Sequence, residues 1–328
     1  MAATPHTPFP FNVTAISPLF QLSPVTSNNT NLGWVPSCAT PECLPTASWS
    51  TSAINSTLSF RYWGWDVAFD GIVKGNLSIQ IFVDGTQEIW SPAGNTLFSH
   101  WSTSNEGAYE HNITLKVLDA SSDAQLTINQ ARVNGSAYAD YYGSTEKWTI
   151  PSNDDRLVYE GFVPQTSVTH SRSSTTYTSS RIGDSLSLQS NASAFVVYGP
   201  CGPTSGLLKV TVENLQRIQQ QIVNTSKPFA SEDCLLFQTW GLAGPTSLKK
   251  ILIENVDGGM IGINRFEAFK VKLYSSGGPS LTRTGIISGA VVGAIAVSVI
   301  VIVVYVKRKA KRRAKRHWEK GSRLKWLC

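Results

Sequence analysis

Residues 76–85 read NLSIQIFVDG, and this stretch decides the fold class. Every second residue from Leu77 to Val83 is apolar, and the dipeptide Asp84-Gly85 then favours a tight turn. A strand with a period of two has one buried face and one wet face, which is typical of antiparallel sheets packed as a sandwich. The stretch therefore predicts a β-strand of an all-β protein.

The same alternation of apolar and polar residues recurs at 113–117, 208–212 and 269–273. We expect an all-β fold of two tandem antiparallel β-sandwich (jelly-roll-like) domains, followed by one transmembrane α-helix.

One segment, 212–224, has a different spacing. Leu215, Ile218 and Ile222 are three and four positions apart, which predicts a short amphipathic helix.

The two halves of the sequence resemble each other in six short matches that keep their order. The offset between matched residues stays between 128 and 139 positions, as loop insertions and deletions would produce. The matches are Leu58-Ser59-Phe60 with Leu186-Ser187-Leu188, Gly71 with Gly199, Val83–Gln87 with Val212–Gln216, Leu97-Phe98-x-x-Trp101 with Leu236-Phe237-x-x-Trp240, Ile113 and Leu115 with Ile251 and Ile253, and Leu126–Asn129 with Ile261–Asn264.

This duplication predicts one sandwich domain over 1–145, with the N-terminal segment included, and a second over 146–274. Because Trp101 and Trp240 are matched in the repeat, we expect both to pack in a core.

A membrane span is predicted at 285–306, which reads GIISGAVVGAIAVSVIVIVVYV without a charge. As a helix it would be about 33 Å long, close to the hydrocarbon thickness of a bilayer. Residues 275–284 before it predict a flexible stalk. The tail 307–328 holds eleven Lys and Arg against one acid, so the positive-inside rule places it in the cytoplasm and the N-terminus outside the plasma membrane.

The basic tail predicts contact with anionic lipid through six residues next to the span. They are Lys307, Arg308, Lys309, Lys311, Arg312 and Arg313. The rest of the chain has a net charge of −4, so we expect no nucleic-acid partner. Gly289 and Gly293 form a GxxxG pattern that would suit a homodimer of spans.

Residues 1–20 lack the basic and apolar regions of a cleavable signal peptide. We interpret this as an incomplete start of the sequence rather than as an N-out anchor.

Four cysteines precede the span, and they allow three disulfide connectivities. The local one, Cys38–Cys43 with Cys201–Cys234, keeps each bridge within one domain and suits an oxidising compartment. Free thiols are the alternative. No histidine lies at ligand spacing from either pair, so we expect no metal and no cofactor.

Glycosylation signals agree with an extracellular N-terminal part, because all eight N-x-S/T acceptors precede the span. They are Asn12, Asn28, Asn55, Asn76, Asn112, Asn134, Asn191 and Asn224.

The segment RYWGWD at 61–66 is the candidate ligand-binding site. Aromatic faces stack on sugar rings, and a carboxylate or a guanidinium can bind hydroxyls. The candidate residues are Arg61, Tyr62, Trp63, Trp65 and Asp66. The alternative is that these aromatic side chains belong to a sandwich core.

The segment Gly183-Asp184-Ser185-Leu186 spells GDSL, the signature of a hydrolase family with a nucleophilic serine. The Asp-x-x-His that would supply the base does not follow, since the only histidine after His170 is His317. A membrane-anchored ectoenzyme acting on esters or glycans is therefore the alternative function, and a non-enzymatic protein is the leading one.

DDRLVYEGF at 154–162, His170 and YTSSRIGDSLSLQSNASAFVVYGP at 177–200 occur in a recognisable order. In this order the chain resembles basidiomycete-type fungal single-pass membrane proteins with two tandem galactose-binding-like (jelly-roll) ectodomains. The resemblance covers both units and the span, and RYWGWD departs from it. It implies a surface protein, a sensor or adhesin, whose ectodomain binds glycan, cell wall or a protein partner.

Overall fold

The computed structural model describes residues 9–38, 43, 46–101, 109–134, 146–166, 175–213, 218–239 and 248–270. Within these ranges the regular structure consists of strands, which confirms the all-β expectation. None of the described residues belongs to a helix long and apolar enough to cross a bilayer. The predicted stalk, span and tail, 275–328, lie outside the described residues, as do Gly289 and Gly293.

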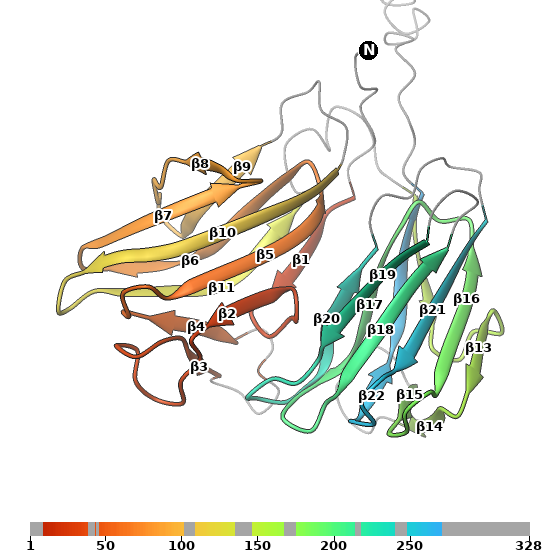
Figure 1. The fold of residues 1–328 in the computed structure, drawn as a ribbon. Coiled ribbons are helices and arrows are strands. Elements are labelled where there is room, and N and C mark those ends of the chain that lie inside the picture. Colours follow the sequence, from red (N-terminus) through yellow and green to blue (C-terminus); the bar gives the residue numbers. More distant parts are fainter. Residues whose placement is uncertain are drawn as a thin grey trace, which may run out of the picture. The chain divides into compact units, whose positions relative to one another are not determined.

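The first half, residues 9–134, forms two antiparallel sheets (Figure 1). One has the order β2-β5-β10-β7-β8, and the other has the order β3-β4-β11-β6-β9 with β1 beside β11. The strands are β1 (Phe11–Thr14), β2 (Phe20–Ser23), β3 (Val35–Ser37), β4 (Ser48–Thr51), β5 (Thr57–Gly64), β6 (Asp66–Lys74), β7 (Leu77–Val83), β8 (Thr86–Glu88), β9 (Thr96–Trp101), β10 (Tyr109–Ala120) and β11 (Gln125–Val133).

The second half, residues 146–270, is also built from antiparallel sheets, of which there are three among its described residues. Their orders are β13-β16-β21-β18-β19, β12-β23-β17-β20 and β14-β15-β22. The strands are β12 (Glu146–Pro151), β13 (Leu157–Glu160), β14 (Val163–Thr166), β15 (Thr175–Ser179), β16 (Ser185–Ser190), β17 (Ala194–Cys201), β18 (Leu207–Glu213), β19 (Ile218–Asn224), β20 (Ser231–Gln238), β21 (Lys249–Asn255), β22 (Ile261–Ile263) and β23 (Arg265–Lys270).

Several residues matched in the sequence repeat occupy the same register positions in both halves. Ile113 of β10 lies between Phe60 and Val83. Its counterpart Ile251 of β21 lies between Leu188 and Val212. Among the described residues, no strand pairing joins the halves. The limits 1–145 and 146–274 stay a prediction, and Met1–Tyr274 form one compact unit.

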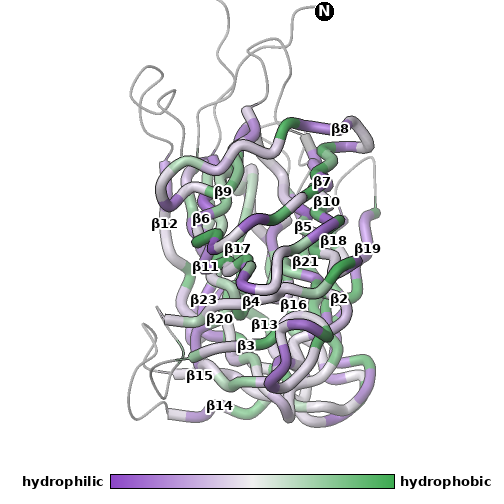
Figure 2. Tube along the Cα trace, turned by 90° about the vertical axis from the view of Figure 1, so that its left-hand side faces the viewer, coloured by the Kyte–Doolittle hydropathy of each residue, from purple (hydrophilic) through white to green (hydrophobic). Residues whose placement is uncertain are grey.

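Opposite sheets of the first half meet through aromatic rings. The Phe60 ring of β5 and the Phe69 ring of β6 meet edge to face, with centroids 5.4 Å apart. Along the strands of both halves, the tube in Figure 2 changes between green and white or purple. This is the alternation that lets each strand bury one face.

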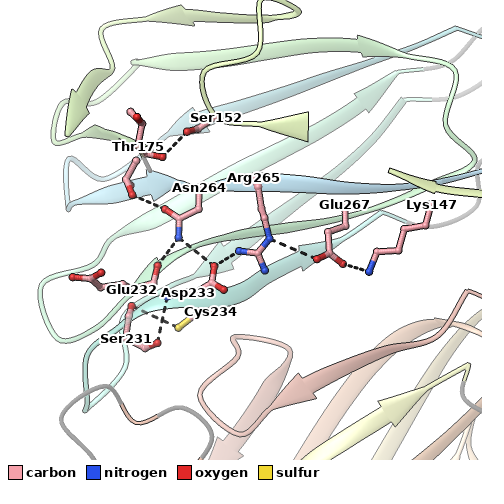
Figure 3. A network of polar contacts seen from close by, with 11 residues as sticks. Lys147, Ser152, Thr175, Ser231, Glu232, Asp233, Cys234, Asn264, Arg265 and Glu267 are labelled. Atoms are coloured by element: carbon pink, nitrogen blue, oxygen red, sulfur yellow. Dashed lines mark hydrogen bonds and ion pairs between the residues drawn. The ribbon is translucent and has the colours of Figure 1, made fainter. Parts of the chain in front are cut away.

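A cluster of polar side chains lies where β22 ends and β23 begins (Figure 3). The Asn264 amide donates to the Glu232 carbonyl at 2.6 Å and accepts a bond from Thr176 Oγ1 at 2.7 Å. Beside it, Arg265 forms ion pairs with Asp233 and with Glu267. The matching residue of the first half, Asn129, lies at a register shift inside a continuous β11.

Both disulfides of the local connectivity are present, Cys38–Cys43 and Cys201–Cys234. This confirms the prediction that each bridge lies within one half.

The helix expected at 212–224 is wrong. Val212 belongs to β18, and Ile218–Asn224 form the edge strand β19 paired along β18. Ile218 and Ile222, which gave the helical spacing, are 66% and 62% exposed and contribute no core contacts. The pairing with β18 therefore overrides the local pattern.

The expectation that Trp101 packs in a core is also wrong. It is 51% exposed at the end of β9, and therefore does not pack in a core. Its match, Trp240, lies outside the described residues.

Candidate functional site

The two halves meet in a contact that we call the seam, between residues 9–134 and residues 146–270. The Gln238 side chain of β20 accepts a hydrogen bond from the Trp63 backbone N–H at 3.0 Å and donates to the Trp63 carbonyl at 2.8 Å. Nearby, the Phe9 ring lies 5.3 Å from Phe269 and 5.2 Å from Trp63. The seam is thus an interior, with satisfied polar groups and packed rings.

Two further contacts fix the seam where the chain enters β2. Ser17 Oγ donates to the Leu235 carbonyl at 2.5 Å, and Lys227 Nζ donates to the Phe20 carbonyl at 3.3 Å. Because these bonds reach backbone atoms, they position the main chain of one half against the other.

A groove of about 640 Å³ follows this part of the seam, and both halves line it. Its volume falls within the usual range of small-ligand sites, which often form at domain contacts. The lining residues of this seam groove are Pro18, Leu19, Phe20, Gln21, Leu22, Val25, Trp49, Arg61, Pro203, Gln221, Ile222, Val223, Asn224, Ser226, Lys227, Pro228 and Leu236.

Uncharged polar residues line the seam groove from both halves. Gln21 comes from β2, Gln221 and Asn224 come from β19, and Ser226 follows β19. The buried Gln221 Oε1 atom accepts no hydrogen bond from the described residues.

Two cations line the seam groove, one from each half. The Nε atom of Arg61 lies 3.0 Å from Glu110 Oε1 at the exposed face of β5. Burial lowers the pKa of the Lys227 amine to about 8, so this amine is mostly charged at neutral pH. No lining residue is an aspartate or a glutamate.

The aromatic rings of the seam groove offer little open surface. Phe20 and Trp49 are only 1% and 2% exposed, and the Trp49 ring also packs 5.7 Å from Phe229. Amide and cationic groups therefore provide most of the chemistry that a ligand would meet.

The structure does not bring the five predicted binding residues onto one surface. Arg61 lines the seam groove, but Tyr62 on the opposite face of β5 is buried and stacks on His111 at 5.0 Å. Trp63 is buried at the seam, Asp66 is buried at the start of β6, and Trp65 between them is half-buried. Tyr62 and Trp63 thus have no open ring face for a sugar.

The acceptor asparagines differ in exposure, and the structure contradicts the expectation that Asn134 carries a glycan. Its side chain is fully buried, and its Oδ1 atom accepts the Trp65 backbone N–H at 2.9 Å. A glycan on this amide is therefore incompatible with the folded chain. The other acceptors are exposed, namely Asn12, Asn28, Asn55, Asn76, Asn112, Asn191 and Asn224.

The GDSL segment forms a turn that enters β16. Ser185 Oγ lies 3.4 Å from Glu160 Oε2, and Asp184 Oδ2 accepts a bond from Ser179 Oγ at 2.7 Å. Gly183 has a φ of 87°, as the turn requires. His170 lies outside the described residues. Within the described ranges, no group of three or more His, Cys, Asp or Glu could hold a metal ion.

Sequence reasoning found Arg61 of the seam groove and missed the rest of it. A strand interpretation of 218–224 would have placed Gln221 and Val223 on one face and Ile222 and Asn224 on the other, and all four line the groove. Nothing in the sequence places β19 at the same groove as β2, since this depends on how the halves pack.

No protein-family model matches the chain, and no curated protein matches it significantly. Among solved structures, a Paenibacillus xanthan lyase has a TM-score of 0.31 and 13% identity, over 81% of this chain and 25% of that one. A family two carbohydrate esterase from Cellvibrio japonicus has a TM-score of 0.26 and 10% identity, over 40% and 36%. The CBM22-1-CBM22-2 tandem domain of Paenibacillus barcinonensis Xyn10C has a TM-score of 0.24 and 11% identity, over 84% and 100%.

The chain spans 25% and 36% of the first two of these proteins. Likenesses with such low TM-scores indicate no function for this chain.

Proposed function

We propose that this chain is a single-pass, non-enzymatic glycoprotein of the plasma membrane whose external part binds a glycan in the seam groove. The observation that carries the proposal is the groove itself, which both halves line with amide, hydroxyl and cationic groups. A saccharide presents hydroxyls on every side, and the amide groups of Gln21 and Gln221 can form hydrogen bonds with them.

The membrane part of the proposal rests on sequence and on the disulfides. The uncharged residues 285–306 precede a strongly basic tail. Cys38–Cys43 and Cys201–Cys234 suit a chain that folds in an oxidising compartment. The anchor would display the groove at the cell surface, as a sensor or an adhesin requires.

The binding test is a glycan-array screen with the full chain in detergent, followed by titration of the best-retained saccharide. We expect Gln221→Ala to weaken binding about tenfold, because the loss of one hydrogen bond to a ligand costs about 1–2 kcal/mol. Gln189→Ala is the matched control, since Gln189 is exposed on β16 and does not line the groove. No retained saccharide, or equal effects of the two variants, would overturn the proposal.

The anchoring test is extraction of membranes at alkaline pH. We expect the chain to stay in the membrane pellet after a carbonate wash and to need detergent for release. We also expect protease added outside intact cells to spare residues 307–328. Release without detergent, or external cleavage of the tail, contradicts the proposed topology.

A further inference from the structure

We propose that the seam groove selects acidic saccharides, in which a carboxylate or a sulfate is held between Arg61 and Lys227. This inference rests on the proposed glycan-binding function and names the ligand class of the same site. Charge, preorganisation and the lack of open aromatic faces argue for it independently.

The charge of the groove is unbalanced. Its lining holds the two cations Arg61 and Lys227 and no acid, and Glu110 beside Arg61 offsets only one positive charge. Lys227 is half-buried, so salt screens its attraction for an anion less than that of the exposed Arg61. An acidic ligand would neutralise the remaining charge.

Arg61 can bind an anion while it keeps its ion pair. Glu110 contacts the Nε atom, and the planar guanidinium presents further N–H donors on its two Nη atoms. Carboxylate and sulfate oxygens suit this fork, and charge-assisted bonds of this kind are about twice as strong as neutral ones.

The segment that carries Lys227 is preorganised. The Lys227 backbone N–H donates to the Gly202 carbonyl at 3.1 Å, and Thr225 Oγ1 donates to the Gly206 carbonyl at 2.7 Å. The Ser226 N–H donates to Asn224 Oδ1 at 2.9 Å. A cation on a fixed backbone loses less entropy when it binds than one on a mobile loop.

The aromatic residues argue against recognition by stacking alone. Since Phe20 and Trp49 are almost fully buried, a neutral sugar would find hydrogen bonds in the groove but no open ring face. An acidic sugar adds the charged contacts that the groove provides.

The test compares trigalacturonic acid with its methyl ester, using the full chain in detergent. The two probes share the same sugar and differ in charge. We expect the acid to bind at least about tenfold more tightly than the ester, and added salt to reduce this difference. Hexaglutamate serves as a third probe, which carries negative charge without a sugar.

Variants assign the selectivity to the two cations. We expect Lys227→Met and Arg61→Gln each to lower the affinity for the acid about tenfold and to leave the ester almost unaffected. Lys250→Met is the matched control, because Lys250 is exposed on β21 outside the groove. Should Lys227→Met fail to fold, the comparison of acid and ester on the unaltered chain still decides.

The contrary outcomes distinguish failure of this inference from failure of the proposed function. Equal binding of acid and ester overturns this inference and leaves a neutral glycan site. Binding of hexaglutamate as tightly as the acid also overturns it, in favour of an acidic peptide partner. If neither these probes nor any saccharide of the array binds, the proposed function itself fails.

Discussion

At the scale of the residue, buried amide side chains fix the backbone at points that sequence patterns do not reveal. Gln238 bonds both backbone groups of Trp63 across the seam, and Asn134 holds the Trp65 N–H. In the sequence, Asn134 looked like a glycosylation acceptor, because the motif N-x-S/T contains no information about burial. Which backbone group such an amide bonds depends on how segments distant in the sequence pack together.

We expect Gln238→Ala to destabilise the folded chain by about 1–3 kcal/mol, because it leaves the Trp63 N–H and carbonyl buried without partners. Guanidinium unfolding followed by tryptophan fluorescence measures this change. Gln189→Ala on the exposed face of β16 is the control and should stay within about 0.5 kcal/mol of the unaltered chain. Equal stabilities of the two variants would contradict the role of the Gln238 amide.

We expect the Asn134 sequon to stay unmodified when the chain is made in a secretory pathway. Its buried Oδ1 already accepts the Trp65 N–H, whereas the Asn76 amide is exposed. Enzymatic deglycosylation in heavy-oxygen water, followed by peptide mass spectrometry, measures the occupancy of each acceptor. A glycan on Asn134 of correctly folded protein is the outcome that this packing forbids.

Lys249 makes stability depend on pH. Burial lowers the pKa of its amine from 10.5 to about 8, although the amine donates to the Ala192 carbonyl at 2.7 Å. Below pH 8 the amine is charged in both states. Between pH 8 and 10.5 the folded chain loses its proton first, so the contribution of Lys249 to stability rises with pH.

Against Lys249→Met, the unaltered chain should therefore gain about 1–3 kcal/mol of relative stability between pH 8 and 10. Urea unfolding at four pH values in this window provides the comparison. Lys250→Met, which removes an exposed lysine from the same strand, should show no such slope. A flat difference for Lys249→Met means that its amine is not desolvated.

At the scale of the element, alternation predicted the strands at 77–83, 113–117 and 208–212 correctly, and the repeat predicted their equivalence. Where a strand buries one face, as from Leu77 to Val83, the period of two is unambiguous. Edge strand β19 buries little, so its exposed Ile218 and Ile222 produced a misleading helical spacing. The local sequence pattern thus identifies strands that bury one face. Strands that are held mainly by pairing with a neighbour cannot be identified until the fold is known.

The matched glycines Gly71 and Gly199 mark equivalent close approaches in β6 and β17. A Cβ atom at Gly71 would lie 2.0 Å from the Thr127 carbonyl oxygen, and one at Gly199 would lie 2.0 Å from that of Gly262. We expect Gly71→Ala and Gly199→Ala each to destabilise the chain by about 1–3 kcal/mol, as overpacking does.

Thermal unfolding measures both variants. Gly202→Ala is the control, since a Cβ atom there meets its nearest neighbour at 3.2 Å and should cost less. If either matched variant were as stable as the control, the equivalence of β6 and β17 at this position would be wrong.

At the scale of the whole molecule, the seam makes one compact unit of Met1–Tyr274. Two repeats that pack through Phe9, Phe269 and Gln238 create a groove that neither would form alone. The sequence predicts the duplication, because both copies keep matched core residues. It does not predict the seam, since no motif or period in the sequence shows which residues of one half meet those of the other.

The most direct test of a binding site shared by both halves is hydrogen–deuterium exchange on the full chain, with and without the saccharide that the array retains best. We predict slower exchange on binding in residues 18–25 of the first half and in residues 221–228 of the second. Slower exchange confined to one half, or in neither segment, would contradict the shared site.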